Sequence, residues 1–213
     1  MNRTPNPLIE QMAADLQPVR SIRFKDGLIL AVLTALVTVV AVELLQGLWR
    51  GAWAGEASAF FVITNGLLLV LACASTSSVL KMANPQVGNN REGARWAMAM
   101  LAVLPIAALA TLFGRDNPLA ALGEHHGLSC FGAGLAASLL SAAMLTLWLR
   151  RGAPVSPSSA GLQVGVASTA LGAAAYGLAC PLDDMVHLGI WHVAPVLVGA
   201  LIGRVFLPPL LRW

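Results

Sequence analysis

Six long apolar stretches run through this 213-residue chain and limit what it can fold into. Each is about 18–24 residues long, enough for a helix to cross a hydrocarbon core about 30 Å thick. Lipid offers no hydrogen-bond partner to the backbone, and the stretches lack the polar alternation of a barrel wall, so we expect helices. They cover Gly27–Leu48, Ala57–Leu80, Trp96–Phe113, Gly127–Leu149, Ala160–Ala179 and Leu188–Leu207.

The remaining sequence leaves no room for a separate soluble domain. Only 11% of the residues are charged and 57% are hydrophobic, whereas soluble domains contain about 25% charged residues. The first 26 residues are polar and lack the apolar core and cleavage site of a secretory signal, so they read as mature sequence. We therefore predict an all-α, polytopic membrane protein: an N-terminal segment, residues 1–26, and a bundle of six transmembrane helices, residues 27–213.

The basic residues predict how the chain is oriented. Of its 13 Lys and Arg residues, only Arg50 and Arg115 fall on the side of the odd-numbered connections. All others lie at the termini or in the even-numbered connections, which places both termini in the cytoplasm by the positive-inside rule. The net charge of +3 is therefore explained by topology beside anionic lipid and gives no indication of direct nucleic-acid binding.

The N-terminal segment contains the pattern of a short amphipathic helix. Asn6 and Pro7 suit a helix cap and a first helical position, and Pro18 ends the run. Such a helix is too short to be stable alone in water. It could lie on the bilayer surface or dock its apolar face on a partner protein, and the acidic residues Glu10 and Asp15 favour the protein. The apolar residues at helical spacing are Leu8, Ile9, Met12, Ala13 and Leu16.

The fourth and fifth stretches are rich in small residues. Gly161 and Gly165 have the small-xxx-small spacing that lets helix backbones approach closely. The fifth stretch is hardly hydrophobic, so we expect other helices to surround it. Pro105 and Pro195 are expected to kink the third and sixth stretches.

Cysteines and histidines gather at the predicted outer ends of the last three stretches. Cys130 begins the fourth stretch and Cys180 ends the fifth, in an oxidising compartment where they could form a disulfide. They could instead bind a soft metal together with nearby histidines and carboxylates, or simply be packing residues. The neighbouring residues with suitable side chains are His125, His126, Asp183, Asp184, His187 and His192.

An enzyme is not expected, because the chain has no standard catalytic motif such as His-Glu-x-x-His or Gly-x-Ser-x-Gly. Cys73 lies in mid-stretch and reads as a packing residue. Glu43 is the only carboxylate well inside an apolar stretch, and such an acid is a functional candidate. With the outer histidines it supports an alternative hypothesis, a small multi-pass transporter or metal-export protein.

An ordered set of motifs resembles the NrsF family of membrane anti-sigma factors. The set spans essentially the whole chain. It consists of Ala14–Arg20, Ser129-Cys130, Arg150–Pro154, Cys180–Asp184, Trp191-His192, Gly199–Arg204 and Leu211–Trp213.

This resemblance implies a multi-pass protein of the bacterial inner membrane that regulates transcription by holding an extracytoplasmic-function (ECF) sigma factor inactive. The cytoplasmic segment 1–26 would bind the sigma factor. The paired periplasmic cysteines, Cys130 and Cys180, would sense oxidative or metal stress. No resident cofactor is expected beyond a transient metal ion at Cys130, Cys180, His187 and His192. The residues predicted to contact the sigma factor are Leu8, Ile9, Met12, Asp15, Leu16, Pro18 and Arg20.

Overall fold

The computed structural model describes residues 6–14, 22–84, 92–118 and 125–211, and within these ranges it contains helices and no strand. In chain order the helices are α1 (Pro7–Ala14), α2 (Phe24–Gln46), α3 (Gly51–Ala54), α4 (Ala59–Met82), α5 (Glu92–Leu101), α6 (Val103–Phe113), α8 (His125–Arg150), α9 (Pro157–Gly177), α10 (Met185–Trp191), α11 (Ala194–Phe206) and α12 (Pro208–Leu211).

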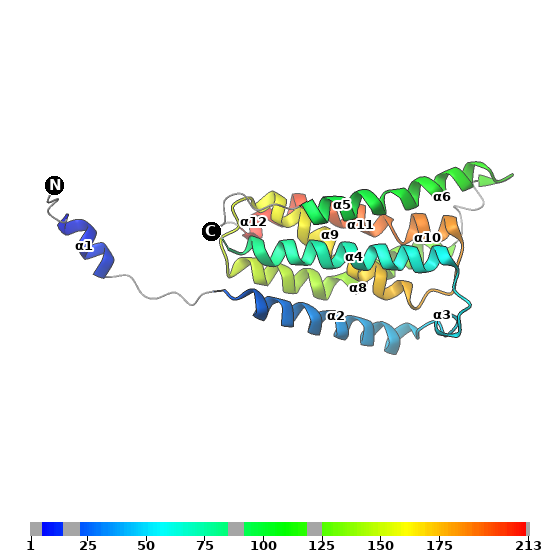
Figure 1. Cartoon of the computed structure of the whole chain (residues 1–213), viewed down its shortest axis with the longest axis horizontal. Helices are drawn as coiled ribbons and strands as arrows, with labels where there is room; N and C mark the ends of the chain where they lie inside the picture. Colours follow the sequence, from blue (N-terminus) through cyan, green and yellow to red (C-terminus); the bar gives the residue numbers. More distant parts are fainter. Residues whose placement is uncertain (1–5, 15–21, 85–91, 119–124, 212–213) are drawn as a thin grey trace.

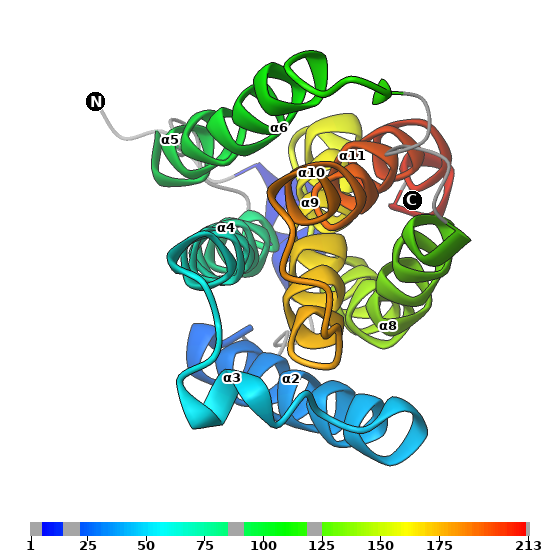
Figure 2. The ribbon, with the colours of Figure 1, turned by 90° about the vertical axis from the view of Figure 1, so that its right-hand side faces the viewer.

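The long helices lie side by side along one axis, with α5 continued by α6 and α10 continued by α11 (Figure 1). α9 lies in the middle of this bundle when it is viewed end-on (Figure 2). Its main contacts are with α8, α11 and α4, and it is buried along most of its length. The expectation that the weakly hydrophobic fifth stretch is surrounded by other helices is confirmed.

Five helical segments in the described part of the chain are long and apolar enough to cross a membrane. α9 has 21 residues but is not among them, because its small and polar residues make it too weakly hydrophobic. Apolar character therefore supports five of the six expected spans, and the count of six stays a prediction. The five are Phe24–Gln46, Ala59–Met82, Gly93–Phe113, His126–Arg150 and Met185–Phe206.

Glycines let α9 approach its neighbours backbone to backbone. A Cβ atom placed on Gly165 would lie 1.9 Å from the carbonyl oxygen of Gly199 in α11. One turn earlier, a Cβ on Gly161 would lie 2.2 Å from the oxygen of Gly203. On the α8 side, a Cβ on Gly172 would lie 2.4 Å from the oxygen of Gly134. No larger residue fits at these contacts, as expected for closely packed membrane helices.

Two prolines interrupt their helices in the same way. α5 ends at Leu101, four residues before Pro105, and α10 ends at Trp191, four residues before Pro195. A proline cannot donate a hydrogen bond to the carbonyl four residues back, and its ring clashes with that carbonyl. The predicted kinks are thus present as short breaks, of one residue between α5 and α6 and of two residues between α10 and α11.

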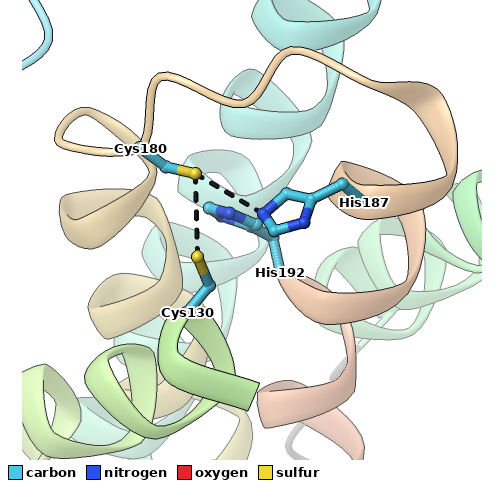
Figure 3. A group of neighbouring side chains, drawn as sticks. All are labelled: Cys130, Cys180, His187 and His192. Carbon is cyan, nitrogen blue, oxygen red and sulfur yellow. Dashed lines mark hydrogen bonds between the residues drawn. The ribbon is translucent and has the colours of Figure 1, made fainter. Parts of the chain in front are cut away.

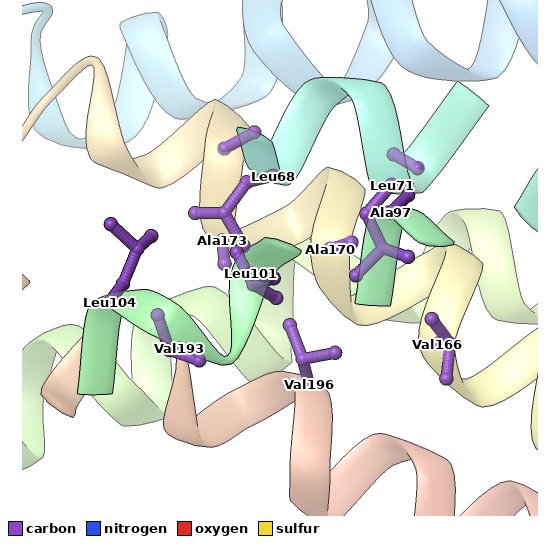
Figure 4. Packing of buried hydrophobic residues seen from close by; sticks show 12 residues of the cluster. Leu68, Leu71, Ala97, Leu101, Leu104, Val166, Ala170, Ala173, Val193 and Val196 are labelled. Carbon is purple, nitrogen blue, oxygen red and sulfur yellow. The ribbon is translucent and has the colours of Figure 1, made fainter. Parts of the chain in front are cut away.

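A cluster of buried aliphatic side chains fills the middle of the bundle (Figure 4). It joins Leu68 and Leu71 of α4 to Ala170 and Ala173 of α9 and to Val196 of α11. Its members are at most 8% exposed. Leucine side chains from α4 and the α5–α6 segment thereby fill the space that the small residues of α9 leave.

Most of the described basic residues gather at one end of the bundle, where α2 begins and α4, α8 and α11 end (Figure 1). Arg50 and Arg115 lie in the connections at the opposite end, beside α3 and after α6. The two groups of basic residues that the sequence places on opposite sides therefore lie at opposite ends of the bundle. Which end faces the cytoplasm stays a prediction.

We expect Gly165→Ala to destabilise the protein, because the added methyl group would collide with the α11 backbone. Overpacking of this kind costs about 1–3 kcal/mol. The measurement is the thermal midpoint of the detergent-solubilised protein. The control is Gly132→Ala on α8, where a Cβ would meet nothing within 4 Å. Equal midpoints for the two variants would contradict the backbone contact.

Candidate functional site

Two cysteines and two histidines meet at the end of the bundle opposite the start of α2 (Figure 3). Cys130 lies in the second turn of α8, Cys180 in the α9–α10 connection, His187 in α10, and His192 directly after α10. All four side chains are buried. One ligand atom from each lies within 4.8 Å of those of the other three. This group, Cys130, Cys180, His187 and His192, is called the Cys2His2 cluster below.

The sulfurs of the cluster are close but not bonded. Cys130 Sγ and Cys180 Sγ lie 3.7 Å apart, and both cysteines are free. A disulfide would bring the sulfurs to about 2.05 Å. The hydrogen bond with Cys130, aided by burial, raises the pKa of the Cys180 thiol. The hydrogen bond and burial therefore favour the protonated form of Cys180.

Two distances within the cluster match those of a tetrahedral metal site. An ion bound by thiolates at about 2.3 Å and imidazoles at about 2.0 Å sets two sulfurs about 3.7 Å apart and a sulfur and a nitrogen about 3.5 Å apart. The observed separations are 3.7 Å between the sulfurs and 3.5 Å between Cys180 Sγ and His187 Nε2. In addition, His192 Nε2 is buried without a hydrogen-bond partner in the described part of the chain. Two sulfur and two imidazole ligands suit Zn²⁺ and soft ions such as Cu⁺.

Asp183 and Asp184 lie outside the cluster and instead fix the connection that carries Cys180. Asp183 accepts hydrogen bonds from the backbone N–H and the hydroxyl of Ser58, at 2.5 and 2.6 Å, at the start of α4. Asp184 caps α10 by accepting from the N–H groups of Val186 and His187, at 3.0 and 3.2 Å. It also pairs with Arg115, just beyond α6, at 2.5 Å. Both carboxylates therefore have structural partners, and neither belongs to the group of side chains that could hold a metal ion.

The surroundings of Asp184 set its charge. Burial acts to raise the pKa of its carboxyl, but the hydrogen bond from Arg115 and the backbone N–H groups of α10 outweigh burial and leave the pKa below its usual value. The carboxylate therefore stabilises the fold in its charged form.

Tyr176 belongs to the site but was not identified from the sequence. It lies on the last turn of α9, with its oxygen 3.9 Å from Cys130 Sγ. Its ring stacks on the imidazole of His192, with ring centres 6.2 Å apart and planes inclined by 28°. The sequence did contain one indication of its role, because Tyr176 is the only tyrosine in the chain and lies four residues before Cys180.

Three other residues singled out from the sequence lie apart from the cluster. Glu43 accepts a hydrogen bond from the backbone N–H of Leu48 at 2.6 Å and so closes the end of α2. Cys73 and His126 are exposed on the outside of α4 and at the start of α8. The side chain of His125 lies outside those that the structure describes. Glu43 thus has a structural partner, and none of these three reaches the cluster.

Comparison with known proteins identifies the family. The sequence profile of the family described as NrsF, negative regulator of sigma F, matches residues 12–213. This chain belongs to the NrsF family. The resemblance found in the sequence motifs is confirmed.

Two relatives illustrate the similarity. The chain is 31% identical over 147 residues to the anti-sigma-F factor NrsF of Caulobacter vibrioides, covering 68% of each chain. It is 26% identical over 156 residues to the probable anti-sigma-F factor NrsF of Azospira oryzae, covering 72% of each chain. No solved structure matches the chain.

The predicted partner-binding residues of this NrsF-family chain fall partly within the described structure. Leu8, Ile9 and Met12 lie on α1, which Asn6 caps by accepting a hydrogen bond from the N–H of Leu8 at 3.1 Å. The three side chains are 62–64% exposed. The remaining predicted contacts, Asp15, Leu16, Pro18 and Arg20, lie outside the described residues.

We expect the charge of Asp184 to make stability depend on pH. Because its folded-state pKa is lowered, its contribution is complete above the unfolded value of about 3.9 and is lost as pH falls through the lower folded value. Asp184→Asn keeps a capping acceptor but removes the charge, so its thermal midpoint should fall less between about pH 5 and pH 3 than that of the wild type. Asp116→Asn, an exposed acid near Arg115, is the control. Parallel pH profiles for the wild type and Asp184→Asn would refute this role.

Proposed function

We propose that this chain is a membrane anti-sigma factor with its input and output at opposite ends of the bundle. Residues 1–26 hold an ECF sigma factor in the cytoplasm and release it when an oxidative or metal signal acts on Cys130 and Cys180 in the periplasm. Membership of the NrsF family supports the regulatory role. The observation that carries the sensing role is the buried Cys2His2 cluster, whose four ligand atoms lie within 4.8 Å of one another.

The proposed location is the bacterial inner membrane, with both termini in the cytoplasm. Its support is the basic end of the bundle, where α2 begins and α11 and α12 end. Positive-inside orientation puts this end in the cytoplasm and the Cys2His2 cluster at the periplasmic face. Residues 27–213 then form the membrane domain, and residues 1–26 form the partner-binding segment.

The proposed output element is α1. Its eight residues include no buried side chain, and a helix of this length gains most of its stability from a partner. Leu8, Ile9 and Met12 provide an apolar face that can enter a groove on the sigma factor. Leu16 extends this face, Asp15 and Arg20 add polar contacts, and Pro18 ends the helix.

We expect Met12→Asp to abolish sigma-factor binding, because it places a charge in the apolar face of α1. The measurement is co-purification of the chain with an ECF sigma factor co-expressed with it, together with a reporter for that sigma factor. Ala14→Asp is the matched control, because it adds the same charge on the other side of the helix. Wild-type co-purification and reporter repression by Met12→Asp would rule out α1 as the binding element.

The proposed input is a change at the two sulfurs. When a metal binds, it supplies the positive charge that lets both thiols lose their protons. Cys130, Cys180, His187 and His192 would hold it. Oxidation is the second route: the two thiols lose two protons and two electrons to an oxidant of the periplasm, and the sulfurs close from 3.7 Å to bonding distance. Both routes act on the same pair of side chains.

We expect the purified chain to bind one Co²⁺ with the absorption of a tetrahedral thiolate site, because two sulfurs and two imidazoles are gathered within 4.8 Å of one another. Cys130→Ser and Cys180→Ser should each weaken binding by about tenfold or more, a loss comparable to that seen when a metal site is disturbed. Cys73→Ser is the matched control, because Cys73 lies on α4 away from the cluster.

The same variants test sensing in cells. Reporter activity should rise on exposure to cadmium or an oxidant in the wild type and in Cys73→Ser, but not in Cys130→Ser or Cys180→Ser. An unchanged stress response in the two cluster variants would remove these cysteines as sensors.

A further inference from the structure

α2 is packed tightly at one end and loosely at the other. Near its start, Gly27 is buried against Trp148 of α8 and Leu80 of α4, and a Cβ atom there would lie 2.6 and 2.8 Å from their side chains. Beyond this point α2 buries only three more residues, all on one face: Thr34, Thr38 and Val42. The closest of these contacts is that of Gly27, at the end that leads into the N-terminal segment.

Two cavities flank the other half of α2. One, of about 370 Å³, lies between α2, α4 and α9 and is lined by Val39, Asn65 and Leu171, among others. The second, of about 240 Å³, lies between α2 and α8 and is lined by Thr38, Val42 and Ala137, among others. Both spaces are partly open at the outside of the bundle, so neighbouring helices do not fill the space beside this half of α2, and it has room to shift sideways.

Tyr176 lies between the second cavity and the Cys2His2 cluster. Its side chain lines the cavity against α2. The same side chain approaches Cys130 Sγ at 3.9 Å and stacks on His192. One residue thus both lines this cavity and contacts the cluster.

A backbone contact adds to this connection. The N–H of Trp49, three residues after α2, donates a hydrogen bond to the carbonyl of Leu178 at 2.8 Å. Leu178 is two residues before Cys180. The far end of α2 is thus tied to the connection that carries one of the two sulfurs.

We propose that the Tyr176 ring couples the Cys2His2 cluster to α2, so that a change at the sulfurs tilts α2 about its Gly27 contact. This inference rests on the proposed function. A change in the positions of Cys130 and His192 shifts the ring that contacts both, and the ring forms a wall of the cavity beside α2. α2 begins at Phe24 and so contains the last three residues of the N-terminal segment, residues 1–26. A tilt of α2 therefore moves the end of the segment that carries α1.

The test uses the full chain, purified in detergent as a complex with its sigma factor, and measures release of the sigma factor on addition of Co²⁺. Tyr176→Ala, compared with the wild type at Co²⁺ concentrations that load the site fully in both, should lose release by about tenfold, a typical size for coupling between two sites. Tyr176→Phe keeps the ring and should release like the wild type. Ala137→Leu, which fills the cavity without touching the cluster, should also reduce release, whereas Ala143→Leu on the exposed side of α8 should not.

The outcomes separate this inference from the function on which it rests. If the wild type binds no sigma factor, or binds one without releasing it on Co²⁺ addition, the proposed function fails. If the wild type responds and Tyr176→Ala with bound Co²⁺ responds equally, only the coupling role of Tyr176 is overturned. Loss of release in Tyr176→Phe as complete as in Tyr176→Ala would overturn the assignment to the ring.

Discussion

Backbone contact between α9 and its neighbours is the constraint on which the rest of the structure depends. Glycines at 161 and 165 let α9 touch α11 through carbonyl oxygens, and Gly172 does the same with α8. Within lipid there is little hydrophobic gain from bringing helices together, so close packing itself must hold them. This contact makes α9 the centre of the bundle and explains why its own sequence is only weakly apolar.

The same packing brings the ends of α8, α9 and α10 to one place and so creates the Cys2His2 cluster. Asp183 and Asp184 then hold the α9–α10 connection to α4, to α10 and, through Arg115, to the end of α6. A cluster fixed in this way has ligand atoms at defined distances before anything binds. Such preorganisation lowers the ordering cost of binding and makes the site responsive to a small change at the sulfurs.

Much of the architecture follows from patterns that act over short distances. Apolar length predicted the helices, proline positions predicted the breaks in the third and sixth stretches, and small residues predicted the enclosed helix. The sequence grouped the four residues of the Cys2His2 cluster because all of them lie at the predicted outer ends of apolar stretches. Asp183 and Asp184 lie between Cys180 and His187 in the sequence and could also bind a metal. In the structure, however, they bond to Ser58, Arg115 and the start of α10. Only the orientation of each side chain separates the two sets.

The sequence by itself determined the helical class, the distribution of basic charge and the family, because these depend on composition and on the order of residues along the chain. Tertiary structure alone decided that the two sulfurs lie 3.7 Å apart, that Tyr176 lies between the cluster and α2, and that one half of α2 is loosely packed. The physical reason is that these features arise where residues distant in sequence meet. The rotation of each helix about its own axis sets those meetings, and close packing with neighbouring helices fixes that rotation.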